Sequence, residues 1–165
     1  MDIRRMARHL FMPSWWAHRI FPVRSLQAIE VAIHDSEMAH VGQIRFSVEG
    51  DLDFIRLLRG LTARDRAIEL FSHLKIWDTE HNNGVLIYLL LADREVEIIV
   101  DRGLHKHLGA RELEDICREM ERAFGEGRFE AGVVEGIKEI GRHLARHYPR
   151  TGATMNELSN KPVVL

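Results

Sequence analysis

The chain has 165 residues, of which 45% are hydrophobic and 29% are charged, a composition typical of one globular domain rather than a disordered segment. Its formal net charge of −2 excludes a general nucleic-acid binder, which needs a basic surface to displace counterions. Cys117 is the sole cysteine, so no intramolecular disulfide forms. No apolar run approaches the ~20 residues that span a bilayer, and none resembles a leader, so we expect a cytoplasmic protein without a transmembrane segment.

Residues 1–21 predict a helical arm that precedes the main domain. Arginine and histidine alternate there with apolar side chains, and Pro13 interrupts the helical pattern. Two interpretations of the arm stay open. Trp15 and Trp16 dock it on a membrane surface or a protein partner, or they pack it as a flap onto the domain.

The main domain is predicted over residues 22–149 and begins with a helix, a strand and a second helix. Apolar residues recur every three or four positions from Pro22 to Met38, which indicates an amphipathic helix. Residues 41–48 alternate between apolar and polar, which predicts a strand. The next helix begins near Thr62, because Asp65 follows three residues later in a pattern typical of a capping box.

The second half of the domain predicts a strand pair followed by two long helices. Residues 85–92 are almost wholly apolar, which is typical of a strand covered on both faces. Residues 96–100 predict a third strand, antiparallel to the second because the connection is short. Helical periodicity then covers 113–124 and 129–148, whereas residues 150–165 lack periodicity and predict a tail. The whole pattern predicts an α/β fold with layered helices and a small mixed sheet.

Chain direction predicts where functional side chains gather. A strand–helix–strand connection is normally a right-handed parallel crossover, so the first two strands start at one edge of the sheet. The third strand runs back and ends at that edge. Three segments therefore converge there: the end of the first long helix, the loop before the second strand and the loop after the third. Their candidate metal ligands are Glu37, His40, Asp78, Asn82, Asn83 and Asp101.

The chemistry of these side chains favours a divalent cation. Carboxylate and amide oxygens, such as those of Asp78, Asn83 and Asp101, are ligands that Ca²⁺ and Mg²⁺ prefer. Glu37 and His40 lie three residues apart, on one helix face if the helix extends that far, where they would hold a softer metal or orient a water molecule. The alternative is structural, because Asp and Asn residues in loops commonly form turns and caps.

Two other groups of residues are interpreted as structural. The opposite edge of the sheet carries Glu49, Asp51, Asp53 and Asp93, which we interpret as a solvated acidic loop. Cys117 lies on the apolar face of a helix, which indicates an inert core thiol and not a nucleophile.

Several segments resemble one known family, the TPM domain. They are the run from Ile29 to Ile44, the Asp-x-x-x-Asn-Asn-Gly segment from Asp78 to Gly84, the Asp-Arg-Gly segment from Asp101 to Gly103, and residues 129–140. The resemblance covers residues 22–149 and implies a three-layer α/β/α sandwich, with a parallel first strand pair and an antiparallel hairpin. It also implies two activities reported among relatives, namely binding of calcium or magnesium and weak acid phosphatase activity.

Three hypotheses about function follow. The first is a domain that binds Ca²⁺ or Mg²⁺ at the converging loops. The second is a metal-assisted phosphatase, in which the cation polarises a phosphoryl oxygen, Arg102 holds the phosphate, and Asp78 or His40 transfers protons. The third is a non-catalytic interaction module that recognises a protein through Trp15 and Trp16.

Overall fold

A computed structural model describes residues 3–13, 15–152 and 155–165. Its helices are α1 (Ile3–Leu10), α2 (Trp16–Ile20), α3 (Val23–Glu37), α4 (Phe54–Leu58), α5 (Ala63–His73), α6 (Ala110–Gly125) and α7 (Phe129–His147), with one 3₁₀ turn at Leu104–Lys106. Its strands are β1 (Gln43–Glu49), β2 (Gly84–Leu90), β3 (Glu95–Val100) and β4 (Val163–Val164).

The sheet has the predicted mixed topology. Its strand order is β3-β2-β1-β4. β1 and β2 are parallel, with Gln43 opposite Gly84. β2 and β3 form an antiparallel hairpin, with Val85 opposite Val100. The parallel first pair and the returning third strand are therefore both confirmed.

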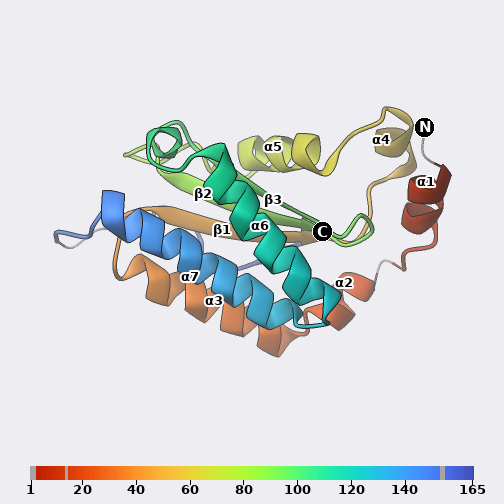
Figure 1. The fold of residues 1–165 in the computed structure, drawn as a ribbon, viewed down its shortest axis with the longest axis horizontal. Helices are drawn as coiled ribbons and strands as arrows, with labels where there is room; N and C mark the ends of the chain where they lie inside the picture. Colours follow the sequence, from red (N-terminus) through yellow and green to blue (C-terminus); the bar gives the residue numbers. More distant parts are fainter. Residues whose placement is uncertain (1–2, 14, 153–154) are drawn as a thin grey trace.

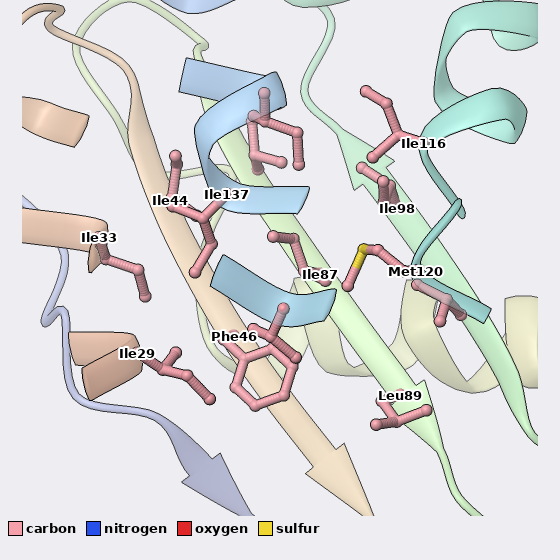
Figure 2. Close-up of a cluster of buried hydrophobic side chains, with 14 of the residues drawn as sticks. Ile29, Ile33, Ile44, Phe46, Ile87, Leu89, Ile98, Ile116, Met120 and Ile137 are labelled. Carbon is pink, nitrogen blue, oxygen red and sulfur yellow. The ribbon is translucent and has the colours of Figure 1, made fainter. Parts of the chain in front are cut away.

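The elements form three layers around this sheet. Figure 1 shows α3, α6 and α7 on one face of the sheet and α5 on the other. Side chains alternate between the two faces along each strand. Ile44, Ile87 and Ile98 point toward the three-helix layer, where Figure 2 shows them packed with α3, α6 and α7 residues. Leu86 and Tyr88 join the smaller core beneath α5. The predicted α/β/α sandwich is confirmed.

Two local predictions also agree with the structure. Thr62 accepts a hydrogen bond from the backbone N–H of Asp65, and the Asp65 carboxylate accepts one from the backbone N–H of Thr62, which completes a capping box at the start of α5. Cys117 is half-buried against the core, and burial raises the pKa of its thiol to about 12. The thiolate is therefore scarce at neutral pH, as expected of an inert core cysteine.

The C-terminal segment differs from the predicted tail. Val163 and Val164 pair in parallel with Ser47 and Val48, so β4 extends the sheet beyond β1. A strand of two residues is too short to show a periodic pattern, and its conformation is set by the free edge of β1. α4 also escaped prediction, because one and a half turns of helix leave little periodicity to detect.

The N-terminal arm is helical and packs onto the domain, but only one of its two tryptophans takes part. Trp15 is 56% exposed, which contradicts the flap interpretation for this residue, whereas Trp16 is 37% exposed and lines a cavity with Leu89 and Phe124 of the domain. Ala17 and Phe21 are the arm's buried apolar anchors. His9 is also buried, and its Nδ1 accepts a hydrogen bond of 2.9 Å from the backbone N–H of Leu52.

The interpretation of the opposite edge as a solvated acidic loop is also wrong for two of its residues. The Asp93 carboxylate is buried, 2.9 Å from Arg5 Nη2 and 3.1 Å from His9 Nε2. Glu49 is buried as well, where it pairs with Arg66. Both carboxylates have partners from distant parts of the chain, which sequence proximity does not show.

Candidate functional site

Backbone hydrogen bonds bring the predicted segments together at the edge where β1 and β2 begin. Asp101 N donates to Gly84 O at 2.9 Å, and Gly103 N donates to Asn82 O at 3.0 Å. On the other side, Asn83 Nδ2 donates to Val41 O at 3.1 Å. We call residues 78–83 and 101–104 the loop edge. The predicted convergence of the loops is therefore confirmed.

Asn83 is the most buried residue of the loop edge, with an exposed fraction of 0%. Its backbone N–H donates to Thr79 Oγ1 at 3.1 Å, and its side-chain amide donates to Val41. Its Oδ1 is buried without a hydrogen-bond partner among the described residues. Since buried polar atoms nearly always have partners, this oxygen is available to a ligand or an ordered water.

Asp101 presents a second oxygen of the same kind. The residue is 6% exposed, and its Oδ1 accepts a hydrogen bond of 2.7 Å from the backbone N–H of Arg102. Its Oδ2 is buried and has no hydrogen-bond partner in the part of the chain that the structure describes. A buried carboxylate oxygen without a hydrogen-bond partner costs more free energy than a buried neutral group without one. A bound cation would therefore be favourable here.

Main-chain oxygens lie close to this carboxylate loop. A Cβ added to Gly103 would lie 2.5 Å from Asn82 O and 2.9 Å from His81 O, so only glycine permits this approach of the two loops. Tyr148, at the end of α7, donates from its hydroxyl to Gly103 O at 2.7 Å and fixes the turn. Sequence reasoning missed Tyr148, whose apolar spacing indicated only a core position.

The remaining residues of the two loops are more exposed. Asp78 and Arg102 are exposed, and Asn82 is half-buried. Asn82 has a φ of 50°, in the left-handed region that asparagine tolerates better than most residues. This conformation supports the structural interpretation of Asn82 as a turn residue.

Glu37 lies near the start of β1, where its carboxylate accepts a hydrogen bond from the backbone. It is 8% exposed, and its Oε1 accepts a hydrogen bond of 2.9 Å from the backbone N–H of Ile44. Burial raises the pKa of Glu37 from 4.5 to about 6. The contact ties the end of α3 to β1, which is a structural role.

His40 lies beyond α3, which ends at Glu37, so the prediction that the two residues share a helix face is wrong, and His40 is committed to local structure. It is 1% exposed, its Nδ1 lies 3.1 Å from Gly42 O, and its Nε2 lies 3.0 Å from Ser36 Oγ. Because a carbonyl only accepts, Nδ1 carries the proton and Nε2 accepts from the serine hydroxyl. Burial lowers the pKa of His40 to about 4. Neither ring nitrogen is left for a metal in this arrangement.

The described residues contain no group of three or more His, Cys, Asp or Glu side chains placed to hold a metal ion. That finding disfavours zinc and other metals bound by several such side chains. Hard cations are less demanding, because amide oxygens, main-chain carbonyls and water complete their coordination. Within the loop edge, the buried unpartnered side-chain oxygens are one carboxylate oxygen and one amide oxygen, which are oxygen types that Ca²⁺ and Mg²⁺ prefer.

A buried ion-pair network lies on the sheet face beneath α5. Arg66 donates to Glu49 Oε2 from Nε at 2.8 Å and to Oε1 from Nη2 at 3.0 Å. The Tyr88 hydroxyl donates to Glu49 Oε2 at 2.7 Å. The carboxylate raises the pKa of the Arg66 guanidinium, which stays charged. Every partner is satisfied, so this network stabilises the α5 layer and offers no open position to a ligand.

Fold and site together define a three-layer α/β/α domain with an oxygen-lined loop edge at the start of its parallel strands. The sequence model of the TPM domain matches residues 19–143, and the chain belongs to this family. A search of curated proteins finds no match. Among the described residues, no helix combines the length and apolarity needed to cross a membrane.

Solved structures with this fold include the following two. The NMR structure of the BA42 protein from the psychrophilic bacterium Bizionia argentinensis has a TM-score of 0.77 and 28% sequence identity, covering 87% of this chain and 94% of that one. The solution structure of the N-terminal domain of a P. gingivalis protein has a TM-score of 0.63 and 17% identity, covering 86% of this chain and 95% of that one. The second similarity concerns the fold alone.

Proposed function

We propose that this TPM domain binds a divalent cation, Ca²⁺ or Mg²⁺, at the loop edge and serves a binding role. The observation that carries the proposal is the pair of buried, unpartnered oxygens, Asn83 Oδ1 and Asp101 Oδ2, on neighbouring loops. The main-chain oxygens of His81 and Asn82 lie beside the same turn and are further candidate ligands. Asp101 supplies the negative charge, and the neutral oxygens complete the coordination with water.

The composition of the donor set predicts weak binding. Cation affinity rises with the number of carboxylates in a site, and the buried part of the loop edge supplies only Asp101. We expect a dissociation constant of about 10⁻⁴ to 10⁻³ M, the range of low-charge calcium sites. A cation at this position joins the turn after β3 to the loop before β2, so binding also stabilises the folded protein.

Phosphate hydrolysis is the less favoured role for this site. Arg102 is exposed next to Asp101, where it is free to approach a phosphate. However, of the two residues predicted to transfer protons, His40 is buried with partners at both ring nitrogens, which leaves only the exposed Asp78. Release of phosphate from an aryl phosphate, measured with and without Mg²⁺, tests hydrolysis separately from binding. Turnover that is lost in Asp101→Asn would assign the site a catalytic role.

Isothermal calorimetry with CaCl₂ and MgCl₂ tests the binding proposal. The informative variant is Asp101→Asn, which keeps the shape of the side chain and the acceptor for Arg102 N–H but removes the charge. We expect saturable binding in the wild type and a loss of about tenfold or more in the variant. Asp115→Asn, at a 62% exposed side chain of α6, is the matched control. No saturation at about 10 mM cation, or equal binding by Asp101→Asn, would refute the proposal.

A further inference from the structure

Exposed apolar side chains gather at the end of the molecule opposite the loop edge. Leu10, Phe11 and Trp15 of the N-terminal arm, and Phe54, Ile55 and Leu58 of α4, are each more than half exposed. Figure 1 shows α1 and α4 next to each other at this end. Leu10 and Phe54 line one small cavity of about 120 Å³, so the two segments are in contact. We call these six residues the arm surface.

The arm exposes these residues while it is firmly attached to the domain. Arg5 donates to Asp93 Oδ2 from Nε and to Leu61 O from Nη2, at 2.9 and 2.8 Å. His9 is buried and accepts from the backbone of Leu52. α1 therefore turns Arg5 and His9 toward the protein, whereas the apolar side chain of Leu10 is exposed to solvent. A helix in this orientation is expected to have a further apolar partner.

The charge of the arm indicates the chemistry of that partner. Five arginines and no aspartate or glutamate lie between residues 3 and 24, although the whole chain has a net charge of −2. Two of them, Arg5 and Arg8, pair with Asp93. The guanidinium carbon of Arg19 lies 5.8 Å from the centre of the Trp15 ring. Arg24, which follows the arm in sequence, and Arg59, which follows α4, are both exposed. Tryptophan, phenylalanine and leucine among arginines are typical of segments that bind the interface of anionic bilayers.

We infer that the arm surface binds the surface of an anionic lipid bilayer. Phe11 and Trp15 enter the boundary between headgroups and acyl chains, and the exposed Arg19 and Arg24 contact the lipid phosphates. The domain lies on the membrane and does not span it. Its loop edge, at the far end of the strands, then faces away from the lipid and remains accessible to cations.

Vesicle binding with a fluorescence readout tests this inference. The chain has three tryptophans, so Trp77→Phe leaves Trp15 and Trp16 as the reporters. The probes are vesicles of phosphatidylcholine alone and vesicles that also contain phosphatidylglycerol. We expect co-sedimentation and a blue shift of the emission with the anionic vesicles only, weakening as salt is added.

The arm surface is altered in the double variant Leu10→Ser and Phe11→Ser. Both side chains are at least 70% exposed, so we expect the variant to fold, and circular dichroism checks this. Anionic vesicle binding should fall by about tenfold or more. Val31→Ser, at a 56% exposed apolar position on α3, is the matched control and should bind normally.

Three results would overturn the inference. They are the absence of binding to anionic vesicles at low salt, equal binding to neutral vesicles, and equal loss in the Val31→Ser control. Concentration-dependent self-association that disappears in the double variant, without vesicle binding, would assign the arm surface to a protein interface instead.

Discussion

Replacing Glu37 by glutamine tests whether its carboxylate has a structural role or is a metal ligand. Glutamine retains an oxygen that accepts from the backbone N–H of Ile44, and it removes the charge that burial disfavours. The pKa of Glu37 rises from 4.5 to about 6 in the folded protein. The folded state thus binds the proton of the Glu37 carboxyl more tightly than the unfolded state does. The stability that this proton contributes is lost as pH rises from about 4.5 through 6.

The size of the effect follows from the same shift. One and a half pKa units correspond to about 2 kcal/mol, so Glu37→Gln should match the wild type near pH 4.5 and exceed it by about 2 kcal/mol at pH 7. For a domain of this length, that difference raises Tm by about 4 to 8 °C. Urea unfolding across this pH range measures the difference, with the exposed Glu119→Gln as the control.

Metal binding should be unchanged in Glu37→Gln, because its carboxylate is committed to Ile44. A variant less stable than the wild type at pH 7, or a stability difference independent of pH, would refute the assigned burial energetics. A loss of calcium affinity would instead restore Glu37 as a ligand.

Three further predictions concern stability. Burial lowers the pKa of His40 from 6.5 to about 4, so its contribution to the free energy of unfolding should fall by about 3 kcal/mol as pH drops from 6.5 to 4. The variant His40→Gln should remove this pH dependence, which acid titrations followed by fluorescence measure. Arg66→Ala leaves the buried Glu49 carboxylate without its cation and should cost about 3 to 5 kcal/mol in urea unfolding, and a loss below about 1 kcal/mol would contradict this. Gly84→Ala places a Cβ 2.1 Å from the backbone oxygen of Ile76, so it should lower the free energy of unfolding by about 3 kcal/mol or more. Gly50→Ala is the control and should cost far less, because the space around Gly50 is open.

The main layers were predictable because long periodic segments carry strong signals. The stripe of apolar residues on α7 and the continuous apolar run of β2 define a buried helix and a buried strand, whatever their partners. Strand direction then followed from the length of the connections, which fixed the edge where the loops meet. The meeting of the loops that carry Asn83 and Asp101 was predictable in this way.

Contacts between distant residues were not predictable from the same patterns. The Asp93 carboxylate lies in a short acidic turn, and nothing near it in sequence reveals that Arg5 pairs with it and that His9 lies beside it. Likewise, Glu37 and His40 have the residue types of metal ligands, but their side chains bond to nearby backbone and to Ser36. The type of a residue predicts which ligands its side chain could bind, whereas burial and nearby hydrogen-bond partners decide whether the side chain is available to bind them.

The central claim is best tested by following backbone amide signals in NMR spectra during a calcium titration. The account predicts saturable shifts concentrated at residues 79–84 and 101–104, with little change in α1 or α6, and their disappearance in Asp101→Asn. Shifts located elsewhere, or loop-edge signals that do not move at about 10 mM calcium, would contradict a cation site at this edge of the sheet.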